Sequence, residues 1–389
     1  MYDPIGTWPF VTTPSNFIPV NEPLLDGNEL RYVSECIRTG WISSEGPFVR
    51  RFEKGLAEFV GRSHGVAVAN GSVALDVAMA ALGIGPGDEV ILPTHTIISC
   101  AAAIVRAGAT PVVVDSDPAT WNMAIGKIGC RITPRTRAIM AVHIFSLPVD
   151  MDPLLDLAQQ HNLYVIEDAA QMIGQSYKDR RCGSFGDIST FSFYPNKHIT
   201  TGEGGMVLCN DDRLAERARS LRNLCFQPGR RFVHEDLGWN FRMSNLQAAL
   251  GFAQLETLPA HLKLKREQGA YYRSALADVP GLELPPADKP YADNLYWVFG
   301  VMLKEGVPLD AEGAIRRLAD LGVGTRPFFW PMHEQPVFRR MGLFPDESHP
   351  FAERMARMGF YIPSGLGTTR EQRSRVVEGV RRVLIGSEG

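Results

Sequence analysis

Short apolar runs rich in β-branched residues alternate with helical patterns from about residue 66 to residue 222. The strand candidates are Val66–Ala69, Glu89–Leu92, Pro111–Val114, Ala138–Val142, Tyr164–Ile166, Ile188–Phe193 and Met206–Cys209. The helical patterns among them are Ser72–Leu82, Ile97–Ala107, Pro153–His161 and Asp211–Arg222. Strands that alternate with helices in this way favour a mostly parallel sheet. We therefore predict an α/β fold with helices on both faces of the sheet.

The rest of the chain indicates a second, smaller unit. A helical region runs from Ser244 to about Ala277, with a break expected near Pro259. A strand at Tyr296–Leu303 and a helix at Asp310–Leu321 follow, and a last helix begins at about Thr369. A chain of 389 residues is too long for one small core. We predict a large domain at residues 1–255, which includes an N-terminal arm, and a smaller α/β domain at 256–389.

Composition excludes several classes of protein. A formal net charge of −3 gives no reason to expect a nucleic acid or an anionic membrane as a partner. The six cysteines form no CxxC pair, which argues against a disulfide framework or a metal site. The first 20 residues lack the basic start and unbroken apolar run of a signal peptide, so we expect none, and no apolar run in the sequence reaches the roughly 20 residues that span a bilayer. We expect a cytoplasmic protein whose first 20 residues form either an extended arm or a disordered tail.

Lys197 is the first candidate for a catalytic role. It stands between the end of a predicted strand and the Gly-rich turn Gly202–Gly205. That position would aim the lysine into a cleft, where loss of solvent lowers the pKa of an amine and makes it a usable nucleophile and base. The alternative, a solvated loop lysine, is the common case for an isolated lysine beside such a turn.

Two further features would lie near Lys197. Asp168 directly follows an apolar strand, at the carboxyl edge where open α/β sheets bind ligands. It could instead cap a helix. The segment Asn70-Gly71-Ser72 joins a strand to a helix whose first backbone N–H groups could bind a phosphate, although such segments are also common capping sequences. A lysine, an acid and a phosphate site are three of the groups that pyridoxal phosphate requires of a protein, beside a group that stacks on its ring and a pocket for the carbonyl substrate.

The order and spacing of these features resemble one protein family along nearly the whole chain. From about Ile18 to the C-terminal helix, the sequence resembles the DegT/DnrJ/EryC1/StrS sugar aminotransferases, which have the type I fold of pyridoxal-phosphate enzymes. Besides the Lys197 segment, the stretches that carry the resemblance are Gly85–Val90, Ile132–Thr136, Glu167–Gln171, Gly183–Asp187 and Gly238–Met243.

The resemblance implies a role for each matching residue. Lys197 would bind the cofactor covalently, Asp168 would pair with its pyridine nitrogen, and Gln171 would lie near its phenolic oxygen. His95 occupies the position assigned to stacking on the ring. Asn240 would reach the phosphate of the neighbouring subunit, which implies a homodimer with shared active sites. The phosphate would be held by Gly71, Ser72, Val73 and Ser192.

Further stretches resemble those family members that aminate GDP-linked 4-keto-6-deoxymannose, a step toward the O-antigen of lipopolysaccharide. They are Thr39–Pro47, Ile199–Met206, Arg230–His234 and Thr325–His333. Arginines in them could clamp a pyrophosphate bidentately, or could be solvated surface charges. Two segments, His143–Pro148 and Glu334–Pro336, depart from that pattern, so a UDP- or dTDP-linked 3- or 4-keto sugar is an alternative substrate. The implied substrate contacts are Trp41, Ser43, Arg231, Arg326 and His333.

The implied reaction is a ping-pong transfer of an amino group from glutamate to the keto sugar. Lys197 would act as general base and acid. Dehydratases similar to this family carry histidine at the position of Lys197, so the lysine favours transamination over dehydration. An NAD(P) oxidoreductase fits the α/β pattern, but no GxGxxG follows the first strand. A non-catalytic regulator would not need the intact cofactor set.

Overall fold

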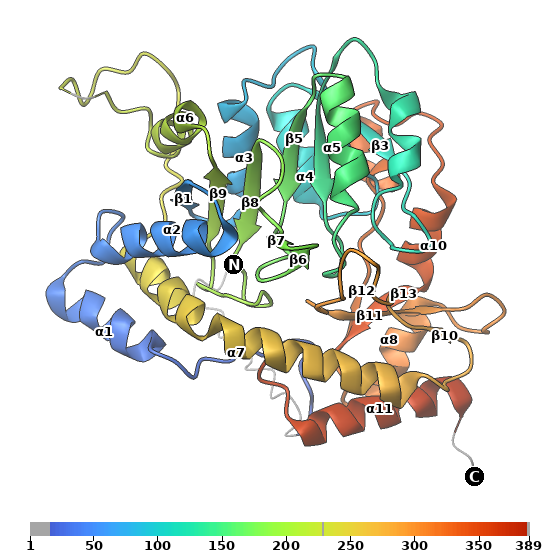
Figure 1. The fold of residues 1–389 in the computed structure, drawn as a ribbon. Coiled ribbons are helices and arrows are strands. Elements are labelled where there is room, and N and C mark those ends of the chain that lie inside the picture. The colour runs from blue at the N-terminus through green and yellow to red at the C-terminus, as the bar shows by residue number, and fades with distance from the viewer. Residues whose placement is uncertain (1–15, 228, 387–389) are drawn as a thin grey trace, which may run out of the picture.

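A seven-stranded sheet forms the centre of the computed structural model, which describes residues 16–227 and 229–386 (Figure 1). The strands lie in the order β1-β9-β8-β5-β4-β2-β3, and only β9 runs antiparallel to its neighbours. This confirms the predicted mostly parallel sheet. The strands are β1 His64–Val68, β2 Glu89–Pro93, β3 Thr110–Val114, β4 Thr136–Val142, β5 Tyr164–Asp168, β8 Ile188–Ser192 and β9 Gly205–Cys209.

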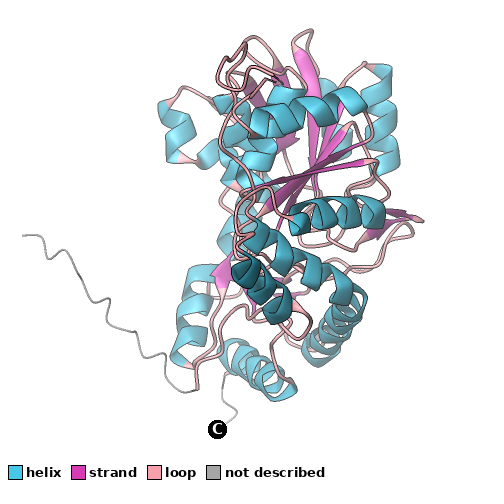
Figure 2. Ribbon diagram, turned by 90° about the vertical axis from the view of Figure 1, so that its left-hand side faces the viewer, coloured by secondary structure: helices cyan, strands magenta, loops and turns pink. Residues whose placement is uncertain are grey.

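Helices cover both faces of this sheet (Figure 2). Successive strand side chains point to opposite faces, so Ile139 and Ala141 belong to one apolar core while Ala138 and Met140 belong to the other. The first core includes side chains of α2 and α5, and the second includes those of α3, α4 and α6. These helices and the preceding α1 span Glu29–Thr39 (α1), Pro47–Val60 (α2), Gly71–Ala81 (α3), Ile98–Arg106 (α4), Met151–Gln160 (α5) and Asp212–Arg222 (α6).

The long helix α7, Asn245–Leu276, crosses the molecule from α2 to the C-terminal part (Figure 1). The break predicted near Pro259 was wrong, because α7 continues through this residue. Pro259 lacks a backbone N–H, so the helix loses one hydrogen bond there. The proline ring is exposed, and the buried side chains of Leu258 and Leu262 hold this part of the helix against the core. The predicted domain boundary at residues 255 and 256 falls within α7, and so coincides with no linker.

A smaller antiparallel sheet, of order β10-β11-β13-β12, forms the C-terminal part with a third apolar core. The strand expected from Tyr296 begins only at Phe299, because Tyr296 adopts a positive φ of 57°, which is incompatible with a strand, and a bend follows it. The elements are β10 Leu282–Glu283, β11 Phe299–Leu303, α8 Ala311–Asp320, β12 Arg326–Pro327, α9 Pro336–Arg340, α10 Pro350–Met358, β13 Gly359–Ile362 and α11 Arg370–Ile385.

The described end of the N-terminal arm pairs with the segment between α8 and β12. The Ile18 amide donates to the Gly322 carbonyl, and the Gly324 amide donates to the Ile18 carbonyl. Residues 1–15 of the predicted arm lie outside the described part of the chain. The remaining short elements are the hairpin β6 Ser176–Tyr177 and β7 Arg180–Arg181 and the 3-10 turns η1 Ile125–Lys127, η2 Gly129–Arg131 and η3 Met332–Glu334.

Two global expectations can be compared with the described residues. All six cysteines are free, and all are buried except Cys130. Within residues 16–227 and 229–386, no helix combines the length and the apolar character needed to cross a bilayer.

The large sheet brings two of the predicted site residues together. Asp168 ends β5 and Ser192 ends β8, and these strands are parallel neighbours, so both residues lie at one edge of the sheet.

Candidate active site

A cavity of about 740 Å³ opens at the carboxyl edge of the large sheet. Its size is typical of a site for a small ligand. One wall comes from the start of α3 and the ends of β5 and β8, and the opposite wall comes from the C-terminal part. The predicted site residues that line it are Gly71, Ser72, Val73, Asp168, Gln171, Ser192 and Lys197. The opposite wall includes Trp297, Phe329 and Tyr361.

Lys197 lies in the turn after β8, with its side chain partly buried. Its Nζ is 3.6 Å from the centre of the Trp297 ring, a geometry in which the indole face favours the ammonium. Burial nevertheless lowers the pKa of Lys197 to about 7, although the charges of Asp168 and Cys100 act to raise it. A large fraction of the amine is therefore neutral near pH 7, as a nucleophile or a base requires.

Asp168 is held rigidly as the last residue of β5 and is only 4% exposed. Its Oδ1 accepts a hydrogen bond from the Ala170 amide at 3.0 Å, and its Oδ2 accepts one from the Cys100 thiol at 3.2 Å. Burial first, and then the Asp168 charge, raise the pKa of Cys100 well above its usual value, so the thiol remains a donor. Asp168 caps no helix, because a turn follows it.

The start of α3 approaches the end of β8 very closely. A Cβ on Gly71 would lie only 2.7 Å from the Cβ of Ser192, so this approach requires glycine. Asn70 caps the helix by accepting from the Val73 amide at 3.0 Å, and the Ser72 hydroxyl lies 2.8 Å from that of Ser99. The free N–H groups of this helix start, with the hydroxyls around them, can bind an anion such as a phosphate.

Two further polar groups on the cavity wall lack protein partners. Thr190 is 1% exposed, and its hydroxyl has no hydrogen bond within the described residues. Gln171 uses its Oε1 to accept from the Phe145 amide at 2.7 Å, and no acceptor for its Nε2 occurs in the described part of the chain. Buried polar groups are nearly always hydrogen-bonded, so the Thr190 hydroxyl indicates a polar molecule in the cavity. The Nε2 of Gln171 is free to donate to such a molecule.

His95 lies behind the cavity and does not line it. The ring is fully buried among Phe145, Phe328 and Phe329, whose centroids are 5.9–6.2 Å away, and burial lowers its pKa to about 3. Ile97, two residues later and 41% exposed, is on the cavity wall instead. Stacking of His95 on a bound ring stays a prediction, whereas Ile97 presents an apolar surface to the cavity.

Trp41, Ser43, Arg231 and Asn240 lie on the surface, and none lines the cavity of its own chain. The carbonyls of Trp41 and Ser43 accept from Asn245 at the start of α7. The residues that follow them, Ser44 and Glu45, share a smaller surface pocket with Asn223 and Arg242. The Asn240 side chain accepts from Arg242 at 2.7 Å. The predicted site residues thus form two separate groups.

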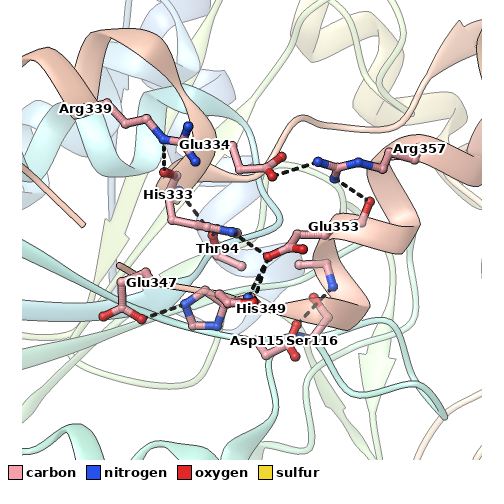
Figure 3. Close-up of polar contacts among 12 residues, drawn as sticks. Thr94, Asp115, Ser116, His333, Glu334, Arg339, Glu347, His349, Glu353 and Arg357 are labelled. Carbon is pink, nitrogen blue, oxygen red and sulfur yellow. Dashed lines mark hydrogen bonds and ion pairs between the residues drawn. The ribbon is translucent and has the colours of Figure 1, made fainter. Parts of the chain in front are cut away.

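Arg326 and His333 differ in their surroundings. Arg326 is exposed on β12, opposite Tyr361 on β13, which lines the cavity. His333 is 1% exposed, with Nδ1 2.7 Å from the Thr94 hydroxyl and Nε2 3.1 Å from Glu353 (Figure 3). Both nitrogens of His333 are therefore engaged within the protein, and a substrate contact for this residue stays a prediction without support from the geometry.

Sequence reasoning missed most of the opposite wall. Trp297 and Tyr361 reach the cavity only because the smaller sheet folds back on the larger one, and no local pattern marks them. Cys100 and Ser99 lie at the start of α4, where the sequence pattern gave a helix but no reason to assign a site. The signal that could have found them is their position just after β2, because residues that follow a parallel strand lie at the carboxyl edge of the sheet.

The comparisons with known proteins agree with this geometry. Three relatives are named GDP-perosamine synthase: one from Caulobacter vibrioides is 43% identical over 95% of this chain and 98% of its own length. Those from Escherichia coli O157:H7 and Vibrio cholerae are 40% and 39% identical, over 94% and 91% of this chain and 98% and 96% of their own lengths.

Solved structures share the fold and the family. The aminotransferase TlmJ from Streptoalloteichus hindustanus superposes with a TM-score of 0.89 at 31% identity, over 96% of this chain and 100% of that chain. DesI, solved with its TDP-sugar product, superposes with a TM-score of 0.87 at 31% identity, over 97% of this chain and 95% of that chain. The sequence model of the DegT/DnrJ/EryC1/StrS aminotransferase family matches residues 23–381. With its lysine and aspartate at one sheet edge, this chain belongs to that family of pyridoxal-phosphate aminotransferases.

Proposed function

We propose that this chain transfers an amino group from glutamate to GDP-4-keto-6-deoxymannose and so produces GDP-perosamine. One observation carries the choice of substrate: three relatives with that synthase name match at 39–43% identity over more than nine tenths of the chain. The intact Lys197 supports transamination rather than dehydration. We expect this reaction in the cytoplasm.

The residues around the cavity fit pyridoxal phosphate as the cofactor. The Gly71–Ser192 approach leaves a cradle that a Cβ would fill, beside free N–H groups for the phosphate. Asp168 would hold the pyridine nitrogen protonated, and the free Nε2 of Gln171 would donate to the ring oxygen. Lys197 would bind the cofactor covalently. When bound, the cofactor supplies an electron sink for the charge that develops at the donor's α-carbon.

The chain itself supplies the proton transfer. The Lys197 amine, with its pKa lowered to about 7, accepts the proton from the α-carbon of glutamate, and in the second half of the reaction it delivers a proton to the former ketone carbon of the sugar. A base with a pKa near the operating pH is both available and able to release its proton. Trp297, buried against Nζ, limits the positions of the amine and shields one side of it from water.

A homodimer would unite the two groups of site residues. Asn240, Trp41 and Ser43 are exposed and remote from the cavity of their own chain, as expected for residues that complete a partner's site. The loop between α6 and α7 extends away from the body in Figure 1. It exposes 81% of Phe232 and 88% of Leu237, apolar surface that a partner would cover. In the dimer, Arg231 on this loop would contact the nucleotide from across the interface, and Arg326 would do so from within the chain.

A different nucleotide is the second candidate. DesI, solved with a TDP-sugar product, superposes over nearly the whole chain. The segment His143–Pro148, which departs from the expected pattern, places Phe145 against Phe328 and Phe329 directly behind the cavity wall. A dTDP- or UDP-linked keto sugar would therefore meet an altered wall rather than a missing catalytic group.

The test is a panel of nucleotide keto-sugars incubated with glutamate and the loaded enzyme, with products identified by mass and NMR. We expect amination of GDP-4-keto-6-deoxymannose and no product with Lys197→Ala. Amination of only a UDP- or dTDP-linked ketone would refute the substrate and retain the reaction class. Loss of a sugar oxygen without incorporation of an amine would refute transamination.

A further inference from the structure

A second, much smaller cavity lies behind the Lys197 segment. Asn196, Lys197 and Trp297 line both this cavity and the active-site cavity, so they separate the two. Lys265 and His198 line only the smaller one. It offers about 10 Å³ for the centre of a water molecule, which is room for about one.

Lys265 is a buried lysine without a carboxylate partner. It lies in α7, is 2% exposed, and donates to the Ser364 carbonyl. No ion pair involves it anywhere in the described part of the chain, and burial lowers its pKa to about 7. Lysine is rarely buried without a compensating group, and Ser364 uses only one of its N–H donors.

His198 presents the opposite deficiency, a buried acceptor without a donor. Its Nδ1 is 3.0 Å from the Ile173 carbonyl, which can only accept, so Nδ1 carries the ring proton. Burial and the nearby Lys265 lower the pKa of His198 to about 3, so the ring is neutral and Nε2 is an acceptor. This Nε2 and the Oδ1 of Asn196 both have no partner within the described residues.

One water molecule can pair with all three of these side chains. It would donate one hydrogen to His198 Nε2 and the other to Asn196 Oδ1, and would accept from Lys265 Nζ. Three hydrogen bonds are typical of a buried water. We propose that Lys265 and His198 are positioning residues for Lys197, joined by one enclosed water that fixes residues 196–198 from behind.

The geometry explains how this water would act on Lys197. The Asn196 carbonyl accepts from the Trp297 indole at 2.7 Å, and the same indole carries Lys197 Nζ on its face. Fixing the Asn196 side chain and the His198 ring therefore fixes both neighbours of Lys197 and the ring on which its amine rests. The inference deepens the proposed function, since it rests on Lys197 as the lysine that binds the cofactor.

The direct test is a crystal structure of the loaded wild-type enzyme at a resolution that shows ordered water. We expect one water within hydrogen-bond distance of Lys265 Nζ, His198 Nε2 and Asn196 Oδ1. An empty cavity, or a Lys265 side chain that turns away from it, would overturn the proposal.

The functional test compares Lys265→Met, His198→Phe and the double variant with Lys263→Met, which removes an exposed lysine from the same helix. Hydrogen exchange of residues 193–202 and release of pyridoxal phosphate, followed by absorbance, are measured in each. We expect each single variant to speed both about tenfold, as the loss of a buried hydrogen-bond partner does. The double variant should resemble a single one, because both remove the same water.

Two outcomes contradict the proposal: unchanged exchange and release in Lys265→Met, or effects that add in the double variant. The melting temperature of Lys265→Met does not test the proposal, because removal of the buried amine should stabilise the protein whether or not Lys265 holds the water. If Lys265→Met fails to fold, His198→Phe and the crystal structure still decide. Borohydride reduction followed by peptide mass separately identifies the lysine that binds the cofactor. A different lysine there would refute the proposed function, while the water and the exchange rates would stand.

Discussion

At the scale of single residues, the charge state of Lys197 results from two opposed influences. Burial lowers its pKa, and the carboxylate of Asp168 partly restores it. Asp168→Asn removes that charge with little change of shape, so the pKa of Lys197 should fall below about 7. The measurement is the pH dependence of Lys197 labelling by an amine-reactive reagent, after removal of the cofactor.

The exposed Lys263 provides the internal reference for that labelling experiment, because Asp168→Asn should leave its reactivity unchanged. A Lys197 pKa that stays constant or rises in Asp168→Asn would mean that the carboxylate does not act on the amine. In the loaded enzyme, the same variant should also weaken cofactor binding, since a neutral amide cannot keep the pyridine nitrogen protonated.

At the scale of elements, α7 provides a test of how packing overrides local preference. Pro259 interrupts the hydrogen-bond ladder of a helix that Leu258 and Leu262 hold in place. Because Pro259 is exposed, Pro259→Ala should restore a donor without loss of packing and raise the free energy of unfolding by about 1–3 kcal/mol. Denaturant unfolding measures this change.

The matched control for that prediction is Pro259→Gly, which restores the same donor but has poor helix propensity. It should stabilise by about 1 kcal/mol less than alanine does. Equal gains from both substitutions, or a loss with alanine, would show that the proline ring itself contributes packing that the structure does not reveal.

The elements also show what the sequence could predict and why. Each strand of the large sheet was found, because a parallel strand buried on both faces leaves a short apolar run such as Tyr164–Ile166. Asp168 was placed at the sheet edge by the same reasoning. The break at Pro259 was mispredicted because long-range packing outweighs the missing donor. Trp297 and Tyr361 were not found, because their place in the site depends on how the two sheets meet.

At the scale of the whole molecule, Lys265 makes the stability of the protein depend on pH. Its pKa is about 7 in the folded protein and about 10.5 in the unfolded chain, so between these values the unfolded chain binds one more proton. Stability therefore rises with pH in this range. Lys265→Met lacks this term and should be more stable than wild type at pH 7.

The advantage of Lys265→Met should shrink by about 1.4 kcal/mol per pH unit between pH 7 and pH 9. Unfolding free energies of the two proteins at several pH values give this difference directly, and groups common to both proteins cancel. Lys263→Met should show no such trend. A difference that is constant with pH would mean that Lys265 is already charged in the folded protein.

If each active site contains residues of two chains, two different inactive variants should restore activity when they form a dimer with each other. Lys197→Ala removes the amine from its own cavity, and Asn240→Ala removes a group that would complete the partner's site. Each variant alone should be nearly inactive. In a mixed dimer, one of the two sites pairs an intact Lys197 with an intact Asn240 from the partner subunit, and the other site lacks both.

Equal amounts of the two variants, unfolded and refolded together, should therefore regain about a quarter of wild-type activity, because half the dimers are mixed and each has one working site. Different affinity tags on the two variants allow the mixed dimer to be isolated and its composition verified. If a verified mixed dimer stays inactive, Asn240 acts within its own chain, and the exposed loop that carries it would need another explanation.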